Sequence, residues 1–168
     1  MTTVGEERLR AELYAAFRNR ALLYWHVFDE LRRALGEPQA TGFLARAIEA
    51  RGRELGQQFV RYGPADLAGL RDAFVGFVPD GGRMFDPDVQ RCDAEVLDIA
   101  LRRCPLKAAW QEAGVADADI ATLCRIAGRV DNGTFEAAGF EFWADTWQPG
   151  RDGCCYLHIR PGQGAGAP

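Results

Sequence analysis

The chain has 168 residues, a length that suits one domain with no need of a disulfide or metal staple. Its 24 acidic and 20 basic residues leave a net charge of −4, so the clustered basic charge of a nucleic-acid binder is absent. No apolar run approaches the ~20 residues of a membrane span, and the polar N-terminus does not resemble a signal peptide. We therefore expect a soluble, cytoplasmic protein that binds neither nucleic acid nor membrane, and whose five cysteines are thiols.

Helical periodicity runs through the first half of the chain. Apolar residues recur at spacings of three, four and seven, which predicts three successive helices. Their expected bounds are residues 6–35, 41–62 and 65–77. Gly36 and Pro38 end the first helix. Gly52 and Gly56 either weaken the second helix, at roughly 1 kcal/mol each, or mark a close approach to another helix.

After a turn at residues 79–82 the pattern changes to alternation with a period of two, which predicts strands. The expected strands are residues 89–103, 139–147 and 154–160. Two helices interrupt them, at residues 106–113 and 116–130, and Asp131-Asn132-Gly133 is expected to break the second of these. A hairpin loop at residues 149–153 joins the last two strands.

This order of elements predicts an α+β fold in which N-terminal helices pack on an antiparallel sheet of three or four strands. We expect a single domain over residues 1–161. A Gly/Ala/Pro tail, residues 162–168, is expected to be disordered.

The cysteines are the unusual chemical feature. Cys104 directly precedes Pro105 at a predicted helix start, where free N–H groups and the positive end of the helix dipole favour a thiolate. Cys124 lies within a helix and is more typical of core packing. Alternation in the last strand places Cys154 and His158 on one face, together with Tyr156. A cysteine and a histidine in one cavity form either a nucleophile–base pair or part of a metal site, whereas a histidine alone is more often structural.

Part of this pattern resembles the L-2-amino-thiazoline-4-carboxylic acid hydrolase family. The matching residues are Cys104-Pro105, Trp110, Gly114, Cys124, Asp131, Gly150 and Cys154. Arg151 and Tyr156 stand where the family has Asp and Phe. The same end of the chain also resembles the 4-vinyl-reductase-like ligand-binding fold, which joins N-terminal helices to an antiparallel sheet.

The resemblance implies a hydrolase that opens a small heterocycle, a cyclic isothiourea, with water and without a cofactor or metal. The candidate catalytic residues are Cys104, Asp131 and Cys154, which the resemblance implies, and His158, which strand alternation adds. The candidate substrate-binding residues are Cys124, Trp110, Arg103, Arg125 and Tyr156. An arginine is expected to hold the substrate carboxylate, and the sequence does not choose among Arg102, Arg103 and Arg125, which lie near the motif. The expected partner is a small-molecule substrate. The sequence does not decide between a monomer and a homo-oligomer.

Two alternatives belong to other functional classes. One is a non-catalytic small-molecule-binding or sensor domain on the same fold. The other is a metal-binding protein whose ligands are Cys104, Cys124, Cys154 and His158. The family hypothesis makes a geometric prediction, that Cys104, Cys124, Asp131 and Cys154 line a common pocket, and its rival is that these cysteines only fill the core.

Overall fold

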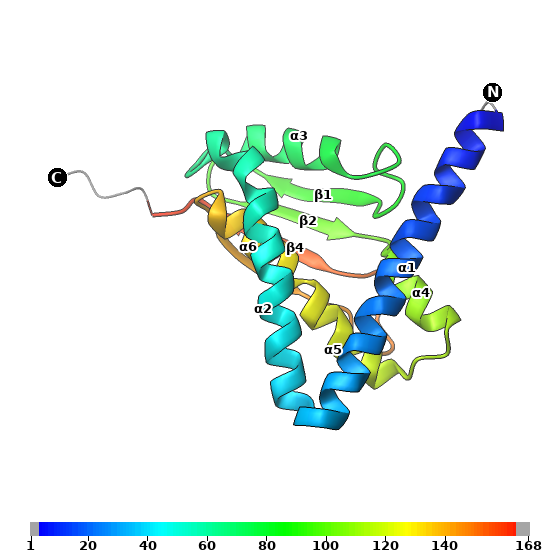
Figure 1. Cartoon of the computed structure of the whole chain (residues 1–168). Helices are drawn as coiled ribbons and strands as arrows, with labels where there is room; N and C mark the ends of the chain where they lie inside the picture. The colour runs from blue at the N-terminus through cyan, green and yellow to red at the C-terminus, as the bar shows by residue number, and fades with distance from the viewer. Residues whose placement is uncertain (1–3, 164–168) are drawn as a thin grey trace.

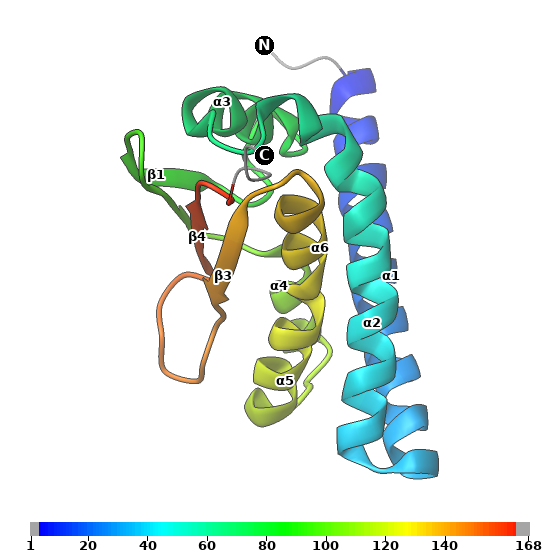
Figure 2. The same ribbon diagram turned by 90° about the vertical axis from the view of Figure 1, so that its left-hand side faces the viewer.

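A computed structural model describes residues 4–163, in which the helices lie against one face of a sheet and leave its other face open (Figures 1 and 2). The helices are α1 (Val4–Leu35), α2 (Glu37–Gly56), the 3-10 helix η1 (Gln57–Tyr62), α3 (Leu67–Phe77), α4 (Pro105–Glu112), α5 (Asp117–Ala127) and α6 (Arg129–Ala137). The strands are β1 (Pro87–Cys92), β2 (Leu97–Leu101), β3 (Glu141–Asp145) and β4 (Tyr156–Arg160). None of these helices is both long and apolar enough to cross a membrane.

The four strands form one sheet in the order β1-β2-β4-β3, and every neighbouring pair is antiparallel. Side chains alternate across it. Ile99 pairs with Leu157 on the buried face, whereas Asp98 pairs with His158 on the open face. The α+β class and the antiparallel sheet are thereby confirmed.

The expected strand at residues 89–103 is wrong, because this segment is the hairpin of β1 and β2. The turn depends on Asp93, whose carboxylate accepts hydrogen bonds from the backbone N–H groups of Glu95 and Val96, each at 2.9 Å. An Asx-type turn of this kind reverses the chain without glycine or proline, so the usual composition signal for a turn is missing.

The glycines of α2 mark a close approach to α6. A Cβ atom on Gly52 would lie 2.2 Å from the carbonyl oxygen of Val130, and one on Gly133 would lie 2.2 Å from that of Glu49. The predicted break at Asp131-Asn132-Gly133 is therefore wrong. These residues lie inside α6, where Gly133 provides contact space rather than a turn.

Two hydrophobic clusters form the interior. One includes Trp110, Cys124 and Cys154 and packs α1 and α2 on α4 and α5. The other includes Phe59 and Phe74 and packs η1 and α3 on the sheet. The chain stays packed slightly beyond the expected boundary at residue 161, since the N–H of Gly162 donates to the carbonyl of Pro64 at 2.8 Å. Residues 164–168 of the expected tail lie outside the described residues.

Candidate functional site

A cavity of about 380 Å³ is lined by residues of both clusters. It lies between the helices and the end of β2 at Leu101. All four residues expected in a common pocket, Cys104, Cys124, Asp131 and Cys154, line it. They come from the start of α4, from α5, from α6 and from the segment before β4. Much of the remaining lining is aromatic, which gives the cavity the composition of a small-molecule site.

Cys104 occupies the N-cap position of α4, with Pro105 at the first helical position. A hydrogen bond from the Cys154 thiol lowers the pKa of Cys104 to about 7, and the N–H groups and positive charge at the start of α4 act in the same direction. This environment favours the thiolate form of Cys104. Cys104 also lines a second, open cleft on the protein surface, so this residue contributes to both the cavity and the cleft.

Cys154 supports this thiolate from the chain segment that leads into β4. Backbone hydrogen bonds fix the segment beside β2: Cys154 N–H donates to Leu101 at 3.0 Å, and Leu101 N–H donates to Cys155 at 2.8 Å. The Cys154 sulfur lies 3.4 Å from that of Cys155. Its hydrogen bond to Cys104 raises the pKa of Cys154 far above the ordinary value, so this thiol stays protonated and serves as a donor. All five cysteines are free thiols in the structure.

Asp131 reaches the cavity because α6 continues through it and packs tightly on α2. Thr134, one turn further along α6, donates its hydroxyl proton to carbonyl oxygens, to that of Gly52 on α2 at 3.2 Å and to that of Val130 at 2.8 Å. Burial raises the pKa of Asp131 to about 7, and the negative charge of Cys104 acts in the same direction. A thiol whose pKa is lowered and a carboxyl group whose pKa is raised thus line the same cavity.

Cys124 and Trp110 form the walls of the same end of the cavity. Burial raises the pKa of Cys124 well above that of an ordinary thiol, which keeps it neutral and unreactive. The indole of Trp110 is fully buried, and its Nε1–H donates to the carbonyl of Ala21 at 2.7 Å, which ties α4 to α1.

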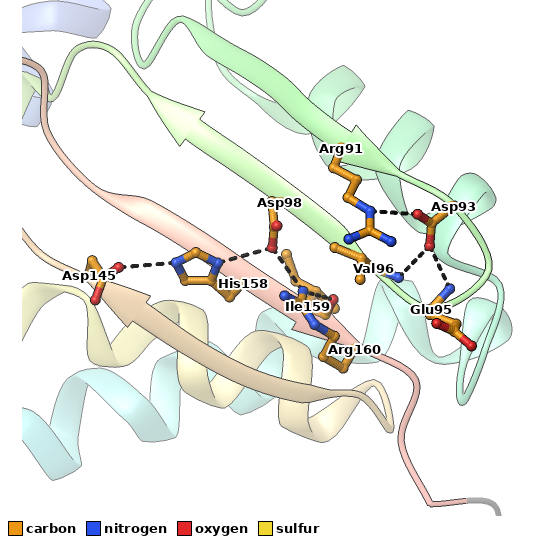
Figure 3. A network of polar contacts seen from close by, with 9 residues as sticks. All are labelled: Arg91, Asp93, Glu95, Val96, Asp98, Asp145, His158, Ile159 and Arg160. Carbon is orange, nitrogen blue, oxygen red and sulfur yellow. Dashed lines mark hydrogen bonds and ion pairs between the residues drawn. The ribbon is translucent and has the colours of Figure 1, made fainter.

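His158 lies on the open face of the sheet, away from the cavity. Its ring nitrogens contact Asp98 at 3.0 Å and Asp145 at 3.2 Å (Figure 3). The expectation that Cys154 shares a face with His158 is wrong, because β4 begins at Tyr156 and the strand alternation does not extend back to Cys154. Tyr156 also lies on the open face, where its ring stacks near that of His158.

The expected arginines do not line the cavity either. Arg125 is exposed and donates to Thr122 at 2.8 Å, and Arg103 lines the surface cleft on the other side of Cys104. Arg20 and Arg51 are the cavity's cations. Arg51 pairs with Glu54, whereas Arg20 lies over the ring of Phe17 and, within residues 4–163, pairs with no carboxylate. They belong to long helices rich in exposed arginine, so nothing in the sequence pattern distinguishes them.

The metal-site alternative lacks a ligand set in the structure. In the part of the chain that is described, no three His, Cys, Asp or Glu side chains come together as metal ligands would. The histidine of the expected set, His158, is on the opposite face of the sheet from Cys104 and Cys154.

Comparison with known proteins agrees with the residue pattern. No curated protein matches the chain. A family model described as L-2-amino-thiazoline-4-carboxylic acid hydrolase matches residues 16–159. This range includes α2–α6, β1–β3, most of α1, most of β4, and the four cavity residues Cys104, Cys124, Asp131 and Cys154. The chain therefore belongs to the L-2-amino-thiazoline-4-carboxylic acid hydrolase family.

Proposed function

We propose that the protein is a hydrolase that opens a cyclic isothiourea of the 2-amino-thiazoline-carboxylate type, with Cys104 as nucleophile and Asp131 as general acid. One observation carries the proposal: a thiol whose pKa is lowered to about 7 and a carboxyl group whose pKa is raised to about 7 line the same cavity. Pairs of groups whose environments shift their pKa values in this way are typical of acid–base chemistry. Membership in a family named for a hydrolase supports the same class of reaction.

In the first step, the Cys104 thiolate adds to the ring carbon that carries the amino group, and a carbon–sulfur bond to the enzyme forms. The ring carbon–sulfur bond then breaks, its electron pair goes to the ring sulfur, and Asp131 gives that sulfur its proton. The product of this step is an open chain with a free thiol, attached to Cys104 as an isothiourea.

In the second step, the Asp131 carboxylate takes a proton from water as the oxygen adds to the same carbon. The bond to Cys104 breaks and returns the thiolate, and the released product is an N-carbamoyl-cysteine type urea. One water molecule is consumed, and both enzyme groups regain their starting protonation states. In both steps Cys154 is the hydrogen-bond donor that stabilises the Cys104 thiolate.

The substrate carboxylate is assigned to Arg20. This guanidinium lines the cavity, and no carboxylate of the described residues occupies it. Arg51, also in the lining, contributes a second positive charge. Arg103 and Lys107 line the surface cleft next to Cys104 and make its entrance attractive to anions.

A binding or sensor role without turnover is the second candidate, favoured by the largely apolar character of the cavity. The two candidates differ in one respect: a sensor binds the heterocycle and releases it unchanged, whereas a hydrolase releases a product that contains an oxygen atom from water.

The test is turnover of 2-amino-thiazoline-4-carboxylate in ¹⁸O-labelled water, followed by mass spectrometry of the product. Wild-type protein is expected to place the label in a carbamoyl group. Cys104→Ser and Asp131→Asn are expected to lose about 10²–10⁴-fold in kcat. Cys92→Ser is the matched control, because Cys92 is a partly buried thiol on β1 outside the cavity lining.

Equal loss of activity in Cys92→Ser would show a general thiol effect. Full activity in Cys104→Ser would remove the nucleophile from the proposal. Binding of the heterocycle without any labelled product would favour the sensor.

A further inference from the structure

The cavity has two chemically different ends. Its thiol end is built from the first hydrophobic cluster and includes Cys124 on α5. Its other end is built from the second cluster and includes Phe59 on η1 and Phe74 on α3. Since α3 and α5 both contribute to the lining, and α3 lies above α5 in both views (Figures 1 and 2), the cavity has walls from two separate parts of the helical layer.

The far end is an aromatic compartment. The ring of Phe59 meets that of Phe77 edge to face, with centroids 5.8 Å apart, and that of Phe74 at 6.3 Å. Leu55 and Val78 also line the cavity, and the side chains of all five residues carry no hydrogen-bonding group. Water in such a compartment lacks partners, whereas an aryl or alkyl group gains both burial and ring contacts.

The size of the cavity agrees with this division. Its volume of about 380 Å³ falls in the ~300–1,000 Å³ range of sites for drug-sized ligands. A single five-membered ring with an amino and a carboxyl group, the compound for which the family is named, is far smaller than such ligands. Such a ring occupies only part of this volume.

We infer that the substrate is a 2-amino-thiazoline carboxylate that carries a large apolar substituent, preferably an aryl group, which occupies the compartment of Phe59, Phe74 and Phe77. This inference rests on the proposed function, because it places the isothiourea carbon at Cys104. It adds the part of the substrate that the reactive residues do not contact.

The experiment compares 2-amino-thiazoline-4-carboxylate with its 5-phenyl derivative, in turnover and in calorimetric binding. Burial of a phenyl group is expected to raise kcat/KM and the binding constant about 10- to 100-fold. Phe77→Ala is expected to remove most of this preference. Phe77 is 47% exposed, so its truncation leaves the core intact.

The matched control is Phe43→Ala on α2, a phenylalanine that is 50% exposed and lies outside the cavity lining. This variant is expected to keep the preference. The inference is overturned if the protein turns over both compounds and prefers the parent ring, or if Phe77→Ala leaves the preference for the phenyl derivative unchanged. In both cases the hydrolase proposal stands.

If neither compound is turned over, the hydrolase proposal is contradicted. Tighter binding of the phenyl derivative would then still support the inferred class of ligand, whereas equal binding of the two compounds would overturn it.

Discussion

At the scale of single residues, the cavity holds four cysteines in different electrostatic settings. Cys104 faces a helix N-terminus and a thiol donor, and both stabilise negative charge. Cys124 faces mostly apolar groups, and Cys154 donates its own hydrogen to Cys104, so in both cases the pKa is raised. The thiolate, not the thiol, is the reactive form, so reactivity should follow these environments.

Alkylation measures this difference directly. Native protein treated briefly with iodoacetamide at pH 7 is expected to be modified first at Cys104, as peptide mass spectrometry would show. Cys124 and Cys154 are expected to react at least about 10-fold more slowly, because they are neutral and buried. A pattern in which Cys92 is modified and Cys104 reacts only after unfolding would refute a thiolate at Cys104.

The sequence was sufficient to place Cys104 at a helix start, since proline is favoured at the first helical position. The sequence pattern gave a wrong prediction for His158, which it placed on the same face as Cys154. Alternation predicts which residues share a face only inside a strand, and β4 begins two residues after Cys154. Arg20 could not be found at all, because one exposed arginine on a long helix looks like any other until the cavity is known.

At the scale of elements, contact between α2 and α6 positions Asp131. Gly52 and Gly56 on α2 and Gly133 on α6 let the two backbones approach until a Cβ atom on any of them would overlap a carbonyl oxygen. Asp131 is less than one turn from this contact. A sequence with Asn and Gly in succession predicts a turn, and only the facing glycines of α2, which the sequence pattern left ambiguous, indicate helix packing instead.

Gly52→Ala tests this contact. Alanine improves helix propensity by about 1 kcal/mol, but its Cβ would meet the Val130 carbonyl, so the helices must separate. We expect a net destabilisation of about 1–3 kcal/mol in urea unfolding, together with loss of turnover as Asp131 moves.

Gly76→Ala on α3 is the matched control for that substitution. Among the described residues, no atom beyond the helix's own backbone and the chain neighbours of Gly76 lies within 4 Å of the position that the new methyl group would take. The propensity gain therefore remains, and the protein should be unchanged or up to about 1 kcal/mol more stable. If the two alanine variants behaved alike, the close α2–α6 contact would not be a determinant of stability.

At the scale of the whole molecule, the fold places one sheet face against the helices and leaves the other to charged and aromatic side chains. This division follows from period-two patterning, which is why the α+β class was predictable. The cavity was not predictable in the same way. The cavity depends on the packing between two hydrophobic clusters, each of which is built from segments that are distant in the sequence.

A buried carboxyl group inside this cavity affects global stability through its proton. The pKa of Asp131 is raised from 3.8 to about 7 on folding, so between about pH 4 and 7 the native state holds a proton that the unfolded chain releases. The stability contributed by this group is fully present below about pH 4 and is lost as pH rises to about 7. The total loss is at most about 4 kcal/mol.

Asp131→Asn removes this dependence. We expect the difference in unfolding free energy between variant and wild type to move in favour of the variant from about pH 4 to pH 7, and then to stay constant.

Cys104 affects stability over a different pH range, and its contribution changes with pH in the opposite direction. Its pKa is lowered from 9.0 to about 7, so its contribution is present above about pH 9 and is lost as pH falls through 7. Urea unfolding of wild type, Asp131→Asn and Cys104→Ala from about pH 4 to pH 9 separates the two groups. Parallel curves for wild type and Asp131→Asn over the lower half of this range would mean that Asp131 is ionised and solvated in the native protein, which would exclude it as the general acid.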